Sequence, residues 1–191
     1  MFDNYRFTLA SASPRRRELL KGLDIAFTVE PGKDEKEAYS EGMPHTDIPE
    51  FLARHKSETF HRELEPREVL ITADTLVFLD EQILGKPHSP EEARQMLRAL
   101  SGRTHTVTTG MALRTRDRIH TFRDTTEVDF APLSDEAIRY YVEHYRPFDK
   151  AGAYGIQEWI GYTGITAIRG SYFNVMGLPV QRLYTELCTF L

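Results

Sequence analysis

The chain has 191 residues, of which 40% are hydrophobic and 28% are charged, and its formal net charge is −5. This composition is typical of a globular protein with a real core and argues against disorder. The acidic balance argues against a nucleic-acid partner, and no apolar run approaches the ~20 residues that cross a bilayer. The single cysteine cannot form an intramolecular disulfide, and the first residues have no signal-peptide pattern, so we expect a cytoplasmic protein without a membrane partner.

The first predicted elements are a strand over 6–10 and a helix that begins at Pro14, with Ser13 as its N-cap. Residues 15–17 are all arginine and fall in the first helical turn. The unpaired N–H groups and the dipole make this helix end positive, so each cation there costs roughly 0.3–1 kcal/mol. The hydroxyl-rich turn and the arginines indicate a phosphate site, and a solvated basic cap is the alternative.

A polar loop over 30–44 follows a short predicted strand over 24–29. Loops of this length often carry binding residues. With no partner for its carboxylates in view, the sequence favours solvated side chains over ligands. A helix is predicted next over 47–60, with Phe51 on its apolar side and Lys56 elsewhere.

The stretch 68–73 is the most continuous apolar run in the first half of the chain, which predicts a strand buried on both faces. This strand is predicted to end at Asp74, ahead of a second apolar run over 76–79. Metal ligands and general bases in α/β proteins often follow a central strand in this way. An Asx turn in a hairpin is the alternative, but we favour a functional aspartate, because a carboxylate between apolar runs needs a cation partner.

Lys86 comes shortly before a helix that is predicted over 90–100, with Ser89 as N-cap and a proline at the first helical position. Beside a bound metal and phosphates this lysine would hold an anion, whereas alone it would be a surface charge. The sequence by itself does not choose between these roles.

The second half of the chain begins with two stretches of β-forming residues, 104–115 and 119–130, which predict a long hairpin. A helix is predicted over 137–145. The segment 149–157 then places small residues where backbone could approach a ligand closely, and its last residue, Gln157, offers both a donor and an acceptor to a base edge.

The tail is predicted to contain a loop and a strand within 170–179, followed by a final helix from Pro179. Cys188 falls in that helical pattern, which predicts a half-buried packing residue rather than a nucleophile.

Taken together, these motifs resemble the Maf family of nucleotide pyrophosphatases, and they occur in the family's order over nearly the whole chain. The matching stretches are Ser11-Ala12-Ser13-Pro14-Arg15-Arg16 with Glu18-Leu19-Leu20, Ala73-Asp74-Thr75, Gly85-Lys86-Pro87, Ser101-Gly102 with His105, Asp149 to Gln157, and Gly170 to Pro179. The resemblance implies one α/β domain over 1–191, with an elongated mixed sheet flanked by helices and two lobes with a cleft between them. It also implies a homodimer and hydrolysis of nucleoside triphosphates to monophosphate and pyrophosphate with Mg²⁺ or Mn²⁺, which keeps non-standard nucleotides out of nucleic acids.

Residue roles follow from the resemblance by position. It implies that phosphates are held by Ser11, Arg15 and Arg16, that the triphosphate is steadied by Lys56 and Lys86, and that the proton acceptor or metal ligand is Asp74. Base specificity is set in the family at the positions of Arg15, Thr75 and Gln157. The segment 149–157 is similar to the branch that acts on dTTP and UTP.

One stretch departs from the family pattern. The family's acidic pair in the first long loop stands here as Lys36-Glu37. Only Glu37 therefore carries over as the second metal ligand, and Asp34 or Glu35 could replace it.

Two other functions would use the same sequence features. A nucleotide-binding regulator of septum formation with little turnover is the leading alternative, because the same residues bind and hydrolyse. A structural or partner-binding protein would make the arginine turn a plain surface feature.

Overall fold

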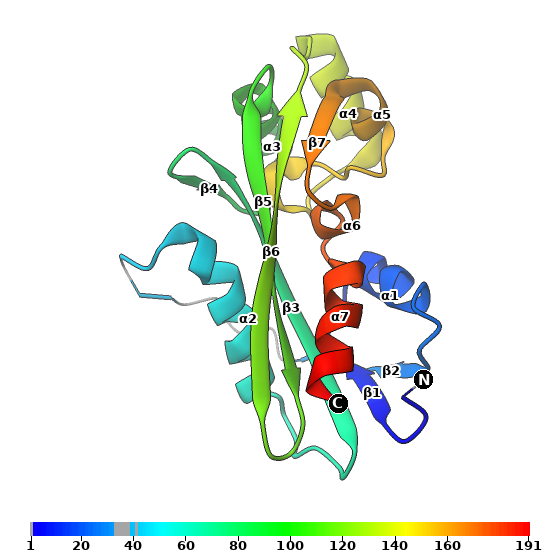
Figure 1. Cartoon of the computed structure of the whole chain (residues 1–191). Helices are drawn as coiled ribbons and strands as arrows, with labels where there is room; N and C mark the ends of the chain where they lie inside the picture. The colour runs from blue at the N-terminus through cyan, green and yellow to red at the C-terminus, as the bar shows by residue number, and fades with distance from the viewer. Residues whose placement is uncertain (1, 33–38, 41) are drawn as a thin grey trace. The chain divides into compact units, whose positions relative to one another are not determined.

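The computed structural model describes residues 2–32, 39–40 and 42–191. Within these residues, seven strands form one mixed sheet in the order β2-β1-β3-β5-β6-β7, with β4 paired to β3 (Figure 1). The α/β class expected from the sequence is confirmed. None of the described helices has the length and hydropathy that a membrane crossing requires.

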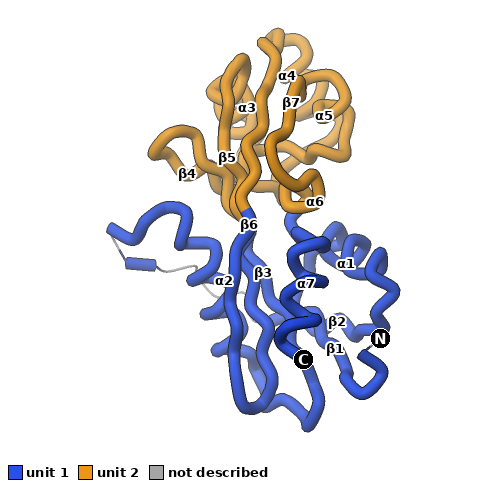
Figure 2. Tube along the Cα trace, in the orientation of Figure 1, with its two compact units in different colours: residues 1–74, 109–124, 177–191 blue, residues 75–108, 125–176 orange. Residues whose placement is uncertain are grey.

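The chain divides into two compact units (Figure 2). Unit 1 comprises Met1–Asp74, Thr109–Asp124 and Gly177–Leu191, and unit 2 comprises Thr75–Thr108 and Thr125–Met176. The strands β3 (Glu68–Leu79), β5 (Thr104–Arg114) and β6 (Ile119–Phe130) each contribute residues to both units. Asp74 is thus the last residue of its segment in unit 1, and Thr75 is the first residue of unit 2.

Unit 1 is organised by three parallel strands. The strand β1 (Arg6–Leu9) pairs in parallel with β2 (Phe27–Val29) on one side and with β3 on the other. Parallel neighbours need crossover connections, and the helices α1 (Pro14–Lys21) and α2 (Ile48–Glu58) occur in them. A short 3₁₀ helix, η1 (His45–Asp47), leads into α2, and α7 (Val180–Phe190) ends the unit.

Unit 2 combines an antiparallel part of the sheet with short helices. Its elements, besides the shared strands, are β4 (Gln82–Leu84), α3 (Pro90–Leu100), α4 (Asp135–Tyr145), η2 (Ala151–Ala153), α5 (Trp159–Gly164), β7 (Ile165–Arg169) and α6 (Tyr172–Val175). The helices α3 and α4 pack together, and their buried Leu97 and Tyr141 belong to one hydrophobic core with strand residues such as Val107.

Local capping signals predicted several element boundaries correctly. The helix α1 begins at Pro14, and α3 spans Pro90–Leu100 with Ser89 as N-cap, its hydroxyl oxygen accepting from the Glu92 N–H at 3.1 Å. The predicted hairpin is formed by β5 and β6. These features were predictable because the caps and the turn are set by residues adjacent in sequence.

The predicted strand end at Asp74 is wrong. The strand β3 continues through Asp74 to Leu79, because residues 77–79 pair antiparallel with 82–84 of β4. The neighbouring strand β1 is the one that ends early, since its last pair with β3 is Leu9 with Ile71. Asp74 therefore lies just past the carboxyl end of β1 and inside β3.

Three smaller predictions are also corrected. The tail strand is β7 at Ile165–Arg169, and residues 172–175 form the helix α6. Cys188 is exposed, because Leu183, Leu187 and Phe190 supply the buried face of α7. Phe51 is 37% exposed, since α2 buries Ile48, Pro49, Leu52, Ala53 and Ser57 instead.

Unit 2 contains a buried, uncharged histidine. His105 is 2% exposed, and its Nε2 lies 2.7 Å from the Tyr154 hydroxyl oxygen. Burial lowers the pKa of His105 from 6.5 to about 4, because desolvation disfavours the imidazolium. This environment is that of a core histidine rather than of a solvent-exposed base.

The low pKa of His105 makes a prediction about stability below neutral pH. The unfolded chain binds a proton near pH 6.5 and the folded chain only near pH 4, so stability is present above pH 6.5 and is lost as the pH falls toward 4. Between pH 7 and pH 5 this histidine should cost about 2 kcal/mol of unfolding free energy. Urea unfolding of the wild type and His105→Gln at both pH values measures it, and an equal pH dependence in the two proteins would contradict the prediction.

Candidate functional site

The start of α1 forms a hydroxyl-rich turn in unit 1. The Ser13 hydroxyl oxygen accepts a hydrogen bond from the Arg16 N–H at 3.4 Å, and the Ser11 hydroxyl oxygen accepts one from the Ser13 N–H at 3.2 Å. Ser11 is 8% exposed. The first turn of α1 contains no acidic residue, so the positive end of the helix coincides with Arg15 and Arg16, and an anion is the expected ligand of such a turn.

Arg16 joins three distant segments of unit 1. Its Nε donates to the Gly177 carbonyl oxygen and its Nη1 donates to the Ala73 carbonyl oxygen, both at 2.8 Å. Ala73 immediately precedes Asp74, so this guanidinium ties the start of α1 to the part of β3 that carries the predicted catalytic residue. Arg17, which lies outside the matching stretch that ends at Arg16, is exposed.

Asp74 has the cationic partner that we expect for a carboxylate between two apolar runs. The side chain of Asp74 is 7% exposed, and its Oδ1 accepts a hydrogen bond from the Lys56 Nζ, whose side chain is 35% exposed. Lys56 belongs to α2 and Asp74 to β3, so residues 18 positions apart in the sequence form an ion pair. Partial exposure leaves the lysine accessible to a further anion.

The position of Lys56 depends on close contact between α2 and the sheet. The Thr72 hydroxyl in β3 donates to the Ala53 carbonyl oxygen of α2 at 2.6 Å. At Gly110 in β5, an added Cβ would lie 2.1 Å from the Glu50 backbone nitrogen of α2. The helix therefore packs its backbone directly on a glycine, and a threonine one strand away fixes its axial position.

In unit 2, the structure brings together the segments that carry Thr75, Lys86 and Gln157. The Gly152 N–H donates to the Gly85 carbonyl oxygen at 3.1 Å, which ties the segment before Gln157 to the residue before Lys86. Gly152 has a positive φ of 69°, and an added Cβ there would lie 3.1 Å from a methyl group of Val77 in β3. Lys86 is exposed, and Thr75 and Gln157 are partly buried.

Gln157 is the third residue of a tight turn. The Glu158 N–H donates to the Gly155 carbonyl oxygen at 3.0 Å, which closes the turn over 155–158. The Oε1 atom of Gln157 is buried, and no group in the described part of the chain donates a hydrogen bond to it. A buried acceptor without a donor costs about 1–3 kcal/mol, so a ligand N–H at this atom would be favourable.

The predicted metal ligands are only partly within the described residues. Asp74 is described, whereas Glu37 and its alternatives Asp34 and Glu35 lie outside the described residues. Across 2–32, 39–40 and 42–191, no three His, Cys, Asp or Glu side chains gather closely enough to hold a metal ion. Asp74 is a hard oxygen donor, which suits Mg²⁺ or Mn²⁺.

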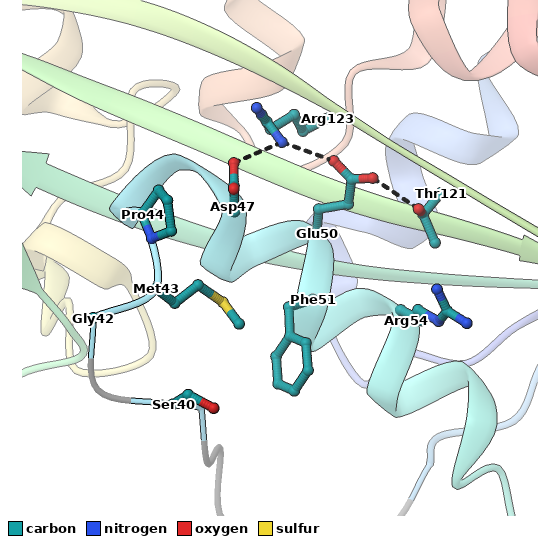
Figure 3. Close-up of a pocket in the computed structure, with 10 residues that line it drawn as sticks. All are labelled: Ser40, Gly42, Met43, Pro44, Asp47, Glu50, Phe51, Arg54, Thr121 and Arg123. Atoms are coloured by element: carbon teal, nitrogen blue, oxygen red, sulfur yellow. Dashed lines mark hydrogen bonds and ion pairs between the residues drawn. The ribbon is translucent and has the colours of Figure 1, made fainter.

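Unit 1 also has an open pocket of about 590 Å³ beside α2 (Figure 3). Met43, Pro44 and Phe51 supply its apolar wall, and the Arg123 Nη1 lies 2.9 Å from Asp47 Oδ1 and 3.1 Å from Glu50 Oε2. None of the predicted site residues that the structure describes lines this pocket. It is therefore distinct from the arrangement around Asp74.

Comparisons with known proteins agree with the resemblance. Residues 6–190 match the family model described as "Maf-like protein". A protein of Phocaeicola vulgatus named dTTP/UTP pyrophosphatase is 52% identical over 97% of this chain and 96% of its own length. A Porphyromonas gingivalis protein of the same name is 51% identical over 100% of this chain and 98% of its own length.

Among solved structures, the chain matches a nucleoside-triphosphatase, dITP/XTP pyrophosphatase, from Mycobacterium abscessus. The identity is 15%, the TM-score is 0.45, and the match covers 67% of this chain and 75% of that chain. A HAM1 protein from Coxiella burnetii matches with 17% identity and a TM-score of 0.42, over 68% of this chain and 74% of that chain.

Proposed function

This chain belongs to the Maf family, and we propose that it hydrolyses dTTP and UTP to the nucleoside monophosphate and pyrophosphate. Two relatives that are about half identical over nearly their full lengths carry the name dTTP/UTP pyrophosphatase. The structural observation that carries the proposal is the buried Asp74, paired with Lys56 and tied through Ala73 to Arg16 at the start of α1. A carboxylate, a lysine and arginines on adjoining segments are the equipment of phosphoryl transfer.

In the proposed reaction, water attacks the α-phosphorus and the bond from this phosphorus to the α–β bridging oxygen breaks, which releases pyrophosphate. The attacking water loses a proton, and the Asp74 carboxylate is the base that accepts it. Lys56 and Lys86 place positive charge beside the triphosphate. Ser11, Arg15 and Arg16 bind phosphate oxygens through hydroxyl, guanidinium and helix N-terminal N–H groups.

A divalent cation, Mg²⁺ or Mn²⁺, fits the donors of this proposal. Mg²⁺ in nucleotide enzymes is commonly held by one or two carboxylates together with substrate phosphates and water. Asp74 would supply one carboxylate and Glu37 the other. The cation, when bound, neutralises charge on the phosphate oxygens.

Base selection is assigned to Gln157, with Thr75 and Arg15. Thymine and uracil both present an imide N3–H between two carbonyl oxygens, whereas cytosine presents an unprotonated nitrogen at that position. The buried Oε1 of Gln157 is an acceptor that suits the N3–H donor. Cytosine nucleotides should then bind poorly, because two acceptors, Gln157 Oε1 and the unprotonated ring nitrogen, would face each other.

The test is pyrophosphate release from dTTP, UTP, dCTP and GTP, each with Mg²⁺ or Mn²⁺ and with EDTA. We expect release from dTTP and UTP that needs the cation, and much slower release from dCTP and GTP. Binding of dTTP without release would instead support the regulator of septum formation. No rise in melting temperature with any nucleotide would support a structural protein, because a ligand at 100 times its Kd should add about 2.7 kcal/mol.

Two further parts of the proposal concern the setting of the enzyme. We propose a homodimer, by analogy with the family, and sedimentation equilibrium of the purified chain tests it. We also propose a cytoplasmic location, where dTTP and UTP are made and used.

A further inference from the structure

The turn that carries Gln157 is bound at both ends by one hydroxyl group. The Tyr141 hydroxyl oxygen accepts a hydrogen bond from the Gly155 N–H at 2.9 Å, and the same hydroxyl donates to the Glu158 Oε2. Gly155 and Glu158 are the first and fourth residues of the turn. The hydroxyl therefore bridges the two ends, and Gln157 lies between the points that it holds.

Further contacts support the same turn inside unit 2. The Lys150 Nζ lies 3.1 Å from Glu158 Oε1 and 2.7 Å from Asp149 Oδ1, and Lys150 is 8% exposed. Behind the turn, an added Cβ at Gly161 in α5 would lie 1.8 Å from the Ile156 carbonyl oxygen. The turn is thus held by the hydrogen bonds and ion pairs of its end residues and by direct packing of the Ile156 carbonyl group on Gly161.

The hydroxyl group of Tyr141 is not needed for packing. Tyr141 is fully buried in the core of unit 2, and its ring alone would serve there, as a phenylalanine ring would. The hydroxyl adds a bond to a carboxylate that Lys150 also binds, and charge-assisted bonds are the stronger kind. Tyr141 and Lys150 are buried, and the Glu158 side chain between them is only 19% exposed. A satisfied polar network of this kind makes the structure around it more rigid.

We infer that Tyr141 is a positioning residue for base selection: by binding Gly155 and Glu158, its hydroxyl holds Gln157 in the orientation that accepts the N3–H of thymine or uracil. The inference rests on the proposed function, in which Gln157 reads the base. It names the substrate feature that the turn selects, an imide N–H flanked by carbonyl groups. It also assigns a part in specificity to a residue of α4 whose side chain is fully buried.

The test compares Tyr141→Phe with Tyr145→Phe, which makes the same chemical change four residues later in α4. Tyr145 is 37% exposed and stacks on Tyr141 with ring centroids 5.1 Å apart. Its substitution therefore controls for the loss of a tyrosine hydroxyl from the same stacked pair. Steady-state release of pyrophosphate from dTTP and dCTP gives kcat and KM for each protein. For Tyr141→Phe we expect the ratio of kcat/KM for dTTP to that for dCTP to fall about tenfold, through a higher KM for dTTP with kcat little changed. Tyr145→Phe should keep the wild-type ratio.

A double-mutant cycle separates positioning from general stability. In a Gln157→Ala background, Tyr141→Phe should not lower the dTTP/dCTP ratio further, because the side chain that it orients is gone. A Tyr141→Phe protein with a lower melting temperature but the wild-type ratio would overturn the inference, and so would a full additional loss in the Gln157→Ala background.

Three more outcomes are decisive. If Tyr141→Phe does not fold, Glu158→Gln, which keeps the shape of the carboxylate but not its charge, takes its place, and an unchanged ratio in that variant overturns the inference. If the wild type releases no pyrophosphate from any nucleotide, the proposed function fails and the inference falls with it. If the wild type and Tyr141→Phe discriminate equally well between dTTP and dCTP, the inference is refuted and the proposed function stands.

Discussion

Asp74→Asn is expected to lower pyrophosphate release from dTTP by a factor of roughly 10²–10⁴, the range that a positioned general base contributes. An amide of the same shape keeps the side chain in place but accepts no proton from the attacking water. It is also a weaker ligand for a hard divalent cation. The measurement is kcat with saturating dTTP and Mn²⁺ or Mg²⁺.

The control for this prediction is Asp117→Asn in the exposed turn between β5 and β6. It makes the same change of charge at an exposed position that is not a proposed site residue, and it should leave kcat at the wild-type value. Because Asp74 is paired with Lys56, the melting temperature of Asp74→Asn is needed as well. Near-full release of pyrophosphate by a folded Asp74→Asn protein would refute the assignment of Asp74 as the base.

Gly110→Ala is expected to lower the free energy of unfolding by about 3 kcal/mol, at the upper end of the cost of overpacking. The added Cβ would lie 2.1 to 2.3 Å from three backbone atoms of Pro49 and Glu50, and backbone cannot rotate away as a side chain can. The helix α2 must therefore shift on the sheet. Since α2 carries Lys56, we also expect kcat/KM for dTTP to fall.

The matched control for Gly110→Ala is Gly32→Ala, where an added Cβ meets no described atom within 4 Å. Loss of chain entropy in the unfolded state should leave that variant at or slightly above wild-type stability. Urea unfolding gives both free energies. A wild-type value for Gly110→Ala would mean that α2 can move off β5 at little cost, and the account of how Lys56 is placed would then be wrong.

The sequence predicted best those helices whose first residues are capped by a side chain close by in the chain. Ser13 before Pro14, and Ser89 before Pro90, satisfy helix N–H groups within four residues of themselves. The prediction at Asp74 went wrong because the length of a strand depends on its partners. The apolar runs on the two sides of the aspartate predict a strand end at Asp74, whereas pairing with β4 continues the strand to Leu79.

The short elements of unit 2 were not predictable in the same way. The helices α5 and α6 span six and four residues, which is too few to establish a helical period. Tyr141 illustrates a different gap. It lies with Ile138 and Val142 on the buried face of α4. No periodicity reveals that its hydroxyl binds a turn that begins 14 residues later.

What the sequence determined by itself was the family and the residue types of the candidate site, because the motifs around Ser11, Asp74, Lys86 and Gln157 are each contiguous. Tertiary structure alone decided which of them act on one another. The pairing of Lys56 with Asp74 and the two carbonyl oxygens bound by Arg16 join residues 18, 57 and 161 positions apart. These contacts depend on the parallel pairing of β1 with β3 and on the close packing of α2 against Gly110. Strand pairing and helix packing join segments that are distant in sequence, so no local pattern encodes them.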